Sequence, residues 1–280
     1  MRKWMRPHMH RRVTQHVTSC LSTTMANLVR SAKSGSNWTT AELLAFNVEV
    51  QTVGAATFFN TPELPAPTVS ETILHNLDRP DGPLSKDDRH FFQYLKEAEG
   101  ANSEDSSAVD DFTAFLLRML DYDNDGRVIR MQKELSFYMA GQHVDAIPDV
   151  CLTNDHDYFL LVQGDKCTAD NPEPQLIAES VAAFYQNHLR CVHAGLPLPQ
   201  SQVILGITMV GTAPFFYRTT ISESLLNALV TASYPTDKTV VFKFIPPVPN
   251  QMSYTIDGMR PLCNRRVVFQ CLEAFKRFIN

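Results

Sequence analysis

Three short stretches decide the fold: Ile147–Val150 (IPDV), Leu160–Lys166 (LLVQGDK) and Pro174–Glu179 (PQLIAE). The first two lie in apolar segments of strand length, and a polar turn separates them. Apolar runs of this length bounded by turn residues predict β-strands, at about 146–153 and 158–166. A β-hairpin is therefore expected at the centre of the chain.

A helix and a further strand are expected after the hairpin. Pro174 suits the first turn of a helix and Gly195 suits its end, which predicts a helix from about 174 to 193. A strand at 202–210 follows, and another is expected before the hairpin, at 128–139. This order predicts a mixed sheet with a right-handed crossover around the long helix.

The rest of the chain divides into regions of different character. The predicted organisation is a basic tail or helix (1–41), a helical N-terminal region (42–107) and an α/β domain (108–280). Turn chemistry and amphipathic spacing predict the following further elements: helices at 42–50, from Ser70, at 85–99, 109–120, 222–232 and 265–278, and strands at 215–219 and 239–244.

The charge of the chain is unevenly distributed. All seven Lys and Arg residues before Glu42 face no acid, whereas the remainder carries 18 bases against 30 acids. Such a body is not a general polyanion binder, because phosphate contacts need clustered Lys and Arg, so any nucleic-acid contact must be local. The basic start has the composition of a mitochondrial presequence, and an ordinary basic helix or loose tail is the alternative.

Hydropathy and cysteine usage limit the class of protein. No apolar run reaches the length of about 18 residues that a membrane helix needs, so no membrane association is expected. The six cysteines contain no C-x-x-C pair, and reduced thiols in an intracellular compartment, cytoplasm or nucleus, are expected. Zinc is not expected.

The hairpin and its helix resemble the PD-(D/E)xK nuclease superfamily, in which a strand bearing Asp turns back into a strand bearing acid-x-Lys. Pro148 and Asp149 supply the first half of that pattern. The resemblance implies a nuclease-like mixed central sheet flanked by helices, with an N-terminal helical region. It also implies a divalent cation, Mg²⁺ or Mn²⁺, held by oxygen ligands to activate a water.

Residues 108–279 also resemble a widespread family of uncharacterised fungal proteins. The resemblance is carried by these segments: Asp149–Cys151, Leu160–Lys166, Pro172–Ala183, Gly206–Tyr217 and Leu272–Lys276. In that family the second strand typically ends Gln-Glu-Asp-Lys. This chain has Gln163-Gly164-Asp165-Lys166, so glycine stands where the metal-binding Glu is expected.

The resemblance assigns site residues one by one. Asp149 is the first metal ligand, Lys166 is the catalytic lysine that orients the water, and Gln175 is a helix residue facing the site. Asp165 is a second candidate metal ligand, through its side chain or its backbone carbonyl. In a regular strand its side chain points away from Asp149, and only a bulge at Gly164 would redirect it.

Other acids near the motif are expected to lie on the surface. Asp110 and Asp111, in the helix before the sheet, and Glu134, in the first strand, could supply a further carboxylate to the site. Each is interpreted as a surface residue.

Two functions remain open at this stage. The first is a metal-dependent nuclease acting on nucleic-acid phosphodiesters, weakened by the missing acid at Gly164. The alternative is a catalytically inactive nuclease-fold protein that binds nucleic acid or a protein partner. The sequence leaves open the partner, the oligomeric state and the choice between DNA and RNA.

A second acidic motif, at 121–126, resembles a calcium-binding loop. Asp121-x-Asp123-x-Asp125-Gly126 matches the start of an EF-hand calcium loop, but position twelve, where a bidentate Glu is needed, is Gln132. We interpret this segment as a helix-to-strand turn with weak calcium affinity.

Overall fold

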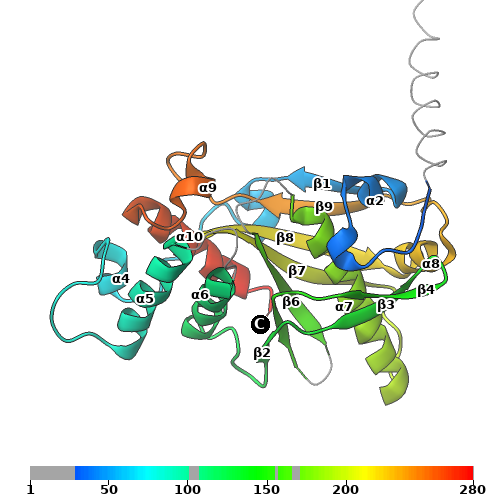
Figure 1. The fold of residues 1–280 in the computed structure, drawn as a ribbon, viewed down its shortest axis with the longest axis horizontal. Coiled ribbons are helices and arrows are strands. Elements are labelled where there is room, and N and C mark those ends of the chain that lie inside the picture. The colour runs from blue at the N-terminus through cyan, green and yellow to red at the C-terminus, as the bar shows by residue number, and fades with distance from the viewer. Residues whose placement is uncertain (1–28, 101–106, 155–156, 166–170, 280) are drawn as a thin grey trace, which may run out of the picture.

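Seven strands form one mixed sheet in the order β1-β9-β8-β7-β6-β5-β2 (Figure 1). The structure, a computed structural model, describes residues 29–100, 107–154, 157–165 and 171–279. The strands of this sheet are β1 (Val48–Thr52), β2 (Val128–Met131), β5 (Val150–Thr153), β6 (Tyr158–Asp165), β7 (Ser201–Val210), β8 (Ala213–Ser222) and β9 (Thr239–Phe244). The chain is thus a mixed α/β protein with helices flanking a central sheet.

The expected hairpin is confirmed, and the long helix joins two parallel strands as expected. Strand β6 pairs antiparallel with β5 and parallel with β7. The parallel pair is joined through α7 (Glu173–Ala194), because two parallel neighbours need a long connection. Gly195 ends this helix in the left-handed conformation, with φ of 67°. Two of the three stretches that opened the sequence analysis therefore meet in the neighbouring strands β5 and β6, and the third begins the helix that packs on β6 and β7.

The segment expected to be one strand at 128–139 is two strands. Gln132 has φ of 46°, which interrupts the extended chain between β2 and β3 (Leu135–Met139). Strand β3 pairs with β4 (Gln142–Ala146), which the sequence analysis did not predict, in a separate two-stranded sheet. The turn between them uses Gly141 with φ of 73°.

The helix expected at 42–50 is shorter, and its second half is a strand. Helix α2 (Thr40–Ala45) begins with a capping box between Thr39 and Glu42, and Asn47 then takes φ of 53°. The following β-branched residues form β1, which pairs parallel with β9 at the edge of the sheet. The N-terminal region therefore contributes to the central sheet as well as to the flanking helices.

The two faces of the sheet are covered by different helices. On one face, Phe216 of β8 packs against Phe275 of α10 (Leu262–Lys276), with ring centroids 5.0 Å apart. On the other, Leu176 of α7 packs so closely on Gly206 that a Cβ atom there would lie 2.8 Å from it. Helix α7 thus lies on the face of β7 to which Gly206 belongs.

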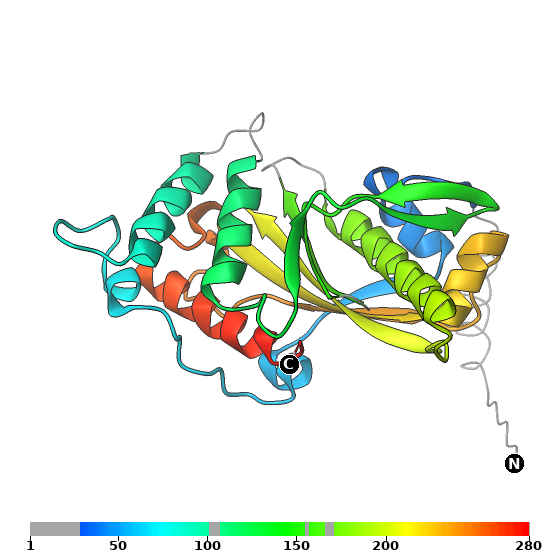
Figure 2. The same cartoon turned by 90° about the horizontal axis from the view of Figure 1, so that it is seen from below.

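The remaining helices gather at the two ends of the sheet (Figures 1 and 2). Helices α4 (Glu71–His75), α5 (Lys86–Gly100) and α6 (Ser107–Met119) lie with α10 beside one end, and α8 (Glu223–Thr231) lies with α2 beside the other. The short elements are η1 (Gly35–Asn37), α3 (Ala55–Phe59) and α9 (Tyr254–Asp257). None of the helices in the described ranges combines the length and the apolar character needed to cross a membrane.

Candidate metal centre at the end of strand β6

The hairpin brings Asp149 against the end of β6. Asp149 immediately precedes β5, and its Oδ2 atom accepts two hydrogen bonds of 2.8 Å, one from the backbone N–H of Gly164 and one from the side-chain amide of Gln163. Donors aimed at a carboxylate stabilise its ionised form. Asp149 is therefore held as an acceptor beside Gly164.

A second carboxylate, from Asp110 of α6, reaches the same glycine. A Cβ atom at Gly164 would collide with Oδ1 of Asp110 and would lie 3.4 Å from Oδ2 of Asp149. Asp110 is only 6% exposed, so its interpretation as a surface residue is wrong. The two acids, 39 positions apart in the chain, flank the point where any side chain at position 164 would begin.

The sequence held a signal for the burial of Asp110. Asp110, Thr113, Ala114 and Leu117 follow the spacing of one helix face, and all four are buried. By contrast, Asp111 and Glu134 are exposed, as expected. An acid on the inward face of an amphipathic helix needs a partner or a function, because burying a charge is costly.

The end of β6 is a regular strand. The pairing with β7 runs without a register shift from Leu160 opposite Leu205 to Asp165 opposite Val210. The bulge at Gly164 that would redirect Asp165 is therefore not present in the β6–β7 ladder. The side chain of Asp165 and the whole of Lys166 lie outside the described residues.

Gln175, expected to face the site, is joined to it through Gln163. The side-chain amide nitrogen of Gln175 donates to Oε1 of Gln163 at 2.8 Å and to Oε1 of Glu179 at 3.2 Å. Glu179 is fully buried, and burial raises its pKa well above the ordinary value, with the negative charge of Asp149 acting in the same direction. Burial therefore favours the neutral, protonated form of Glu179 relative to an exposed glutamate.

The sequence analysis did not identify Gln163 and Glu179 as part of the site. Gln163 follows a run of apolar strand residues and is 8% exposed, while Glu179 lies among the apolar residues that α7 turns towards the sheet. A polar residue inside an apolar period is the signal that could have identified both.

Lys243 lies on the face of the sheet covered by α7, opposite the face from which a side chain at Gly164 would project, and its charge is already paired. Nζ of Lys243 in β9 lies 2.5 Å from Oε1 of Glu173, which also accepts from the Tyr217 hydroxyl at 3.0 Å. Because this ion pair compensates its charge, Lys243 does not replace the cationic role that the sequence assigns to Lys166.

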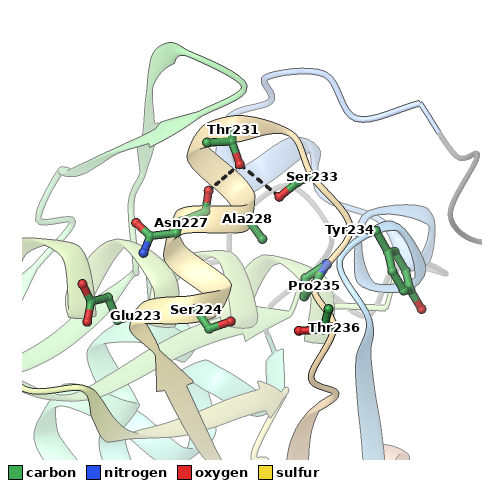
Figure 3. Close-up of a pocket in the computed structure, with 9 residues that line it drawn as sticks. All are labelled: Glu223, Ser224, Asn227, Ala228, Thr231, Ser233, Tyr234, Pro235 and Thr236. Carbon is green, nitrogen blue, oxygen red and sulfur yellow. Dashed lines mark hydrogen bonds between the residues drawn. The ribbon is translucent and has the colours of Figure 1, made fainter.

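Two surface hollows lie elsewhere on the molecule. One of roughly 570 Å³ is lined mainly by polar residues of α8 and the loop that follows it (Figure 3). There the Thr231 hydroxyl donates a hydrogen bond to Asn227 O and shares another with the Ser233 hydroxyl. Another of roughly 600 Å³ lies beside α5 and Arg260. Neither is lined by Asp149 or Gln175.

No protein-family model matches the chain, and no curated protein sequence is significantly similar to it. Within the described ranges, no three His, Cys, Asp or Glu side chains are arranged to hold a metal ion. Any divalent ion at Gly164 would therefore rely on two carboxylates there, those of Asp110 and Asp149, together with other oxygen atoms.

Proposed function

We propose that this chain is a divalent-metal-dependent, PD-(D/E)xK nuclease-like protein that acts on nucleic-acid phosphodiesters. One observation carries the proposal. The carboxylate of Asp110 occupies the space next to Gly164 from which the family's strand glutamate would project, beside the carboxylate of Asp149. Asp110 thus replaces from a helix the acid that the strand has lost.

The residues present suit Mg²⁺ or Mn²⁺. Both are hard cations that prefer oxygen, and Mg²⁺ is commonly held by one or two carboxylates together with substrate phosphates and water. Asp110 and Asp149 would supply the carboxylates, and the backbone carbonyl of Asp165 is a further oxygen at the end of the same strand. When bound, such an ion polarises the phosphate and lowers the pKa of the attacking water.

The remaining roles belong to residues of the chain. Asp149 is kept in place by the N–H of Gly164, so the ligand geometry is set before substrate arrives. In this proposal Lys166 orients the water and stabilises the negative charge that develops on the phosphate. In this proposal Lys166, two residues after Gly164, projects from the same face of the strand as Gly164, because strand side chains alternate between the two faces.

Metal titration of single variants tests the assignment. We expect isothermal calorimetry with Mn²⁺ to show binding to the wild-type chain and a loss of at least about tenfold in affinity for Asp149→Ala and for Asp110→Ala. Asp111→Ala is the matched control, because Asp111 is the next residue on the same helix and is exposed. Its Mn²⁺ affinity should equal that of the wild type.

A cleavage assay completes the test. Plasmid DNA, single-stranded DNA and RNA incubated with Mn²⁺ should be cut by the wild type and by Asp111→Ala, and not by Asp149→Ala. Equal Mn²⁺ affinity in all four proteins would refute the metal centre, because neither acid would then be a ligand.

Gly164 favours a second candidate function, a catalytically inactive descendant that binds nucleic acid or a protein partner. Two side-chain carboxylates with no strand acid could hold a metal too weakly for cleavage. Nucleic-acid binding by the wild type without cleavage of any of the three substrates, together with unchanged binding by Asp149→Ala, would support this alternative.

A further inference from the structure

Four polar side chains form a continuous hydrogen-bonded row beneath the first turns of α7. The row runs from Glu179 to Gln175, from Gln175 to Gln163 and from Gln163 to Asp149, with distances of 3.2, 2.8 and 2.8 Å. Gln163 is 8% exposed and Glu179 is fully buried. Buried amides that are not hydrogen-bonded are costly, so the row is a specific arrangement of the core.

The Asp149 carboxylate at one end of the row determines which way each side-chain amide in the row points. An ionised Asp149 can only accept, so Gln163 must present its NH₂ group to it and turn its carbonyl oxygen towards α7. That oxygen must receive a donor, and the NH₂ group of Gln175 supplies it while also donating to Oε1 of Glu179. Each amide is therefore held in one orientation.

The row terminates at an atom with no partner among the described residues. Oε2 of Glu179 is buried and forms no hydrogen bond with them, whereas Oε1 is the acceptor that holds Gln175. Burying this acid has a desolvation cost that an apolar residue of similar volume would not have, and its one hydrogen bond in the described residues is the one that holds Gln175.

We propose that Gln163 is a positioning residue that fixes the Asp149 carboxylate beside Gly164, and that Gln175 and Glu179 hold Gln163 in turn. This inference rests on the proposed metal-dependent function. Gln163 and the N–H of Gly164 donate to the same oxygen, so together they determine the rotation of the carboxylate and the direction of its other oxygen. Gln175, which the sequence analysis placed facing the site, acts through Gln163.

Metal affinity measures the effect of removing the row. Gln163→Met keeps the length of the side chain and removes its hydrogen bonds with Asp149, Gln175 and Gly164 O. It should weaken Mn²⁺ binding by about 10- to 100-fold, as loss of a partner behind a metal ligand usually does. Gln175→Met should weaken binding less. Gln186→Met, on the same helix with its amide bound to Ser136 O, is the matched control and should bind as the wild type does.

A double variant separates positioning from general loss of packing. Because Gln175 acts only through Gln163, Gln163→Met combined with Gln175→Met should bind Mn²⁺ as weakly as Gln163→Met alone. Losses that multiply would show two independent effects and would overturn the proposed row.

A second measurement needs no metal. The Gly164 amide donates to Asp149, so its hydrogen exchange, followed by NMR, should become several-fold faster in Gln163→Met, while the Val162 amide keeps its rate. An unchanged Gly164 rate would overturn the inference even if the chain bound no Mn²⁺. If Gln163→Met failed to fold, Gln175→Met should move both readouts in the same direction.

The outcomes distinguish the two proposals. If Asp149→Ala abolishes Mn²⁺ binding and Gln163→Met leaves it unchanged, the metal centre stands and the positioning role is wrong. If Asp149→Ala has no effect on Mn²⁺ affinity, the metal centre itself is wrong.

Discussion

The chain contains two groups of aspartates, and they differ in how sequence relates to space. In the loop 121–127, three aspartates stand at the spacing of a calcium ligand string. At Gly164, two aspartates that belong to different elements meet around one glycine. The three aspartates at 121–125 stand out in the sequence, but in the structure they belong to a connecting turn.

The loop serves to connect α6 to β2. Tyr122 is fully buried, and its hydroxyl donates to Leu272 O at 2.6 Å, while Arg127 donates to Ile279 O at 3.2 Å. Asp125 is 84% exposed and lies 3.6 Å from the Arg127 guanidinium. The bonds of Tyr122 and Arg127 attach the loop to α10 and to the residues that follow it.

The group at Gly164 is built from long-range contacts. Asp110 reaches the glycine from α6, and Asp149 is held there by β6. Acids that are close in sequence can bind one ion only if the loop backbone turns their side chains towards a common point. Acids on separate helices and strands meet only when the tertiary fold places those elements together. The predictions below test this difference.

The largest expected effect is a loss of stability without a loss of metal binding when the loop 121–127 is altered. Tyr122→Ala should lower the free energy of unfolding by about 3–5 kcal/mol, because it removes a fully buried aromatic ring. Urea denaturation measures the loss. Mn²⁺ affinity of the folded fraction should not change, and a parallel loss of Mn²⁺ binding would show that the loop and the Gly164 site are coupled.

The next effect concerns the space at Gly164. Gly164→Glu should lower the free energy of unfolding by about 1–3 kcal/mol, because the new Cβ collides with Asp110 and a third carboxylate joins the two already there. Adding Asp110→Ala frees that space, so the double variant should recover most of the stability and bind Mn²⁺ through the strand glutamate and Asp149.

Thermal and urea unfolding of the single and double variants, with Mn²⁺ titration, decide this prediction. Asp111→Ala combined with Gly164→Glu is the control and should remain as unstable as Gly164→Glu alone. Wild-type stability in Gly164→Glu would mean that Asp110 does not occupy the space next to the glycine.

The sequence predicted the central hairpin, α7 and most later elements because their apolar periods and turn residues are local. It was wrong at 42–50, since β1 is stabilised by pairing with β9, nearly 200 residues away. It also missed β4, whose partner β3 follows an interruption at Gln132.

For the site, the sequence located Asp149 and Gly164 but not their neighbours. Asp110 was expected on the surface, although its helical spacing groups it with residues that are buried. Gln163 and Glu179 resemble ordinary polar positions until the sheet and α7 are placed together. Local spacing could have indicated that these residues are buried, but the partners that they meet depend on contacts between distant elements.

The third prediction concerns the pH dependence of stability. The pKa of buried Glu179 is raised above 4.5, so above that pH the folded state binds more protons than the unfolded state and stability falls as pH rises towards the raised pKa. The slope is at most about 1.4 kcal/mol per pH unit. Glu179→Gln should lack this contribution to the slope, so its free energy of unfolding relative to the wild type should increase with pH.

Urea unfolding at a series of pH values above 4.5 measures the difference. Gln186→Met, on the same helix but away from Asp149, should keep the wild-type slope. Parallel curves for the wild type and Glu179→Gln would contradict the raised pKa of Glu179.

The smallest expected effect is that of calcium on the loop 121–127. In an EF-hand the twelfth residue supplies a bidentate carboxylate, and here that residue is Gln132, whose N–H donates to Asp149 O at 2.9 Å at the far end of β2. Strand β2 thus separates Gln132 from Asp121 and Asp125, so the twelfth residue cannot join the loop aspartates in binding one ion. Millimolar Ca²⁺ should therefore stabilise the chain by less than about 0.5 kcal/mol, and Asp121→Ala should not alter that response in thermal unfolding. Micromolar Ca²⁺ affinity that Asp121→Ala abolishes would show instead that the loop closes without its twelfth ligand, and the contrast between the two groups of aspartates would then fail.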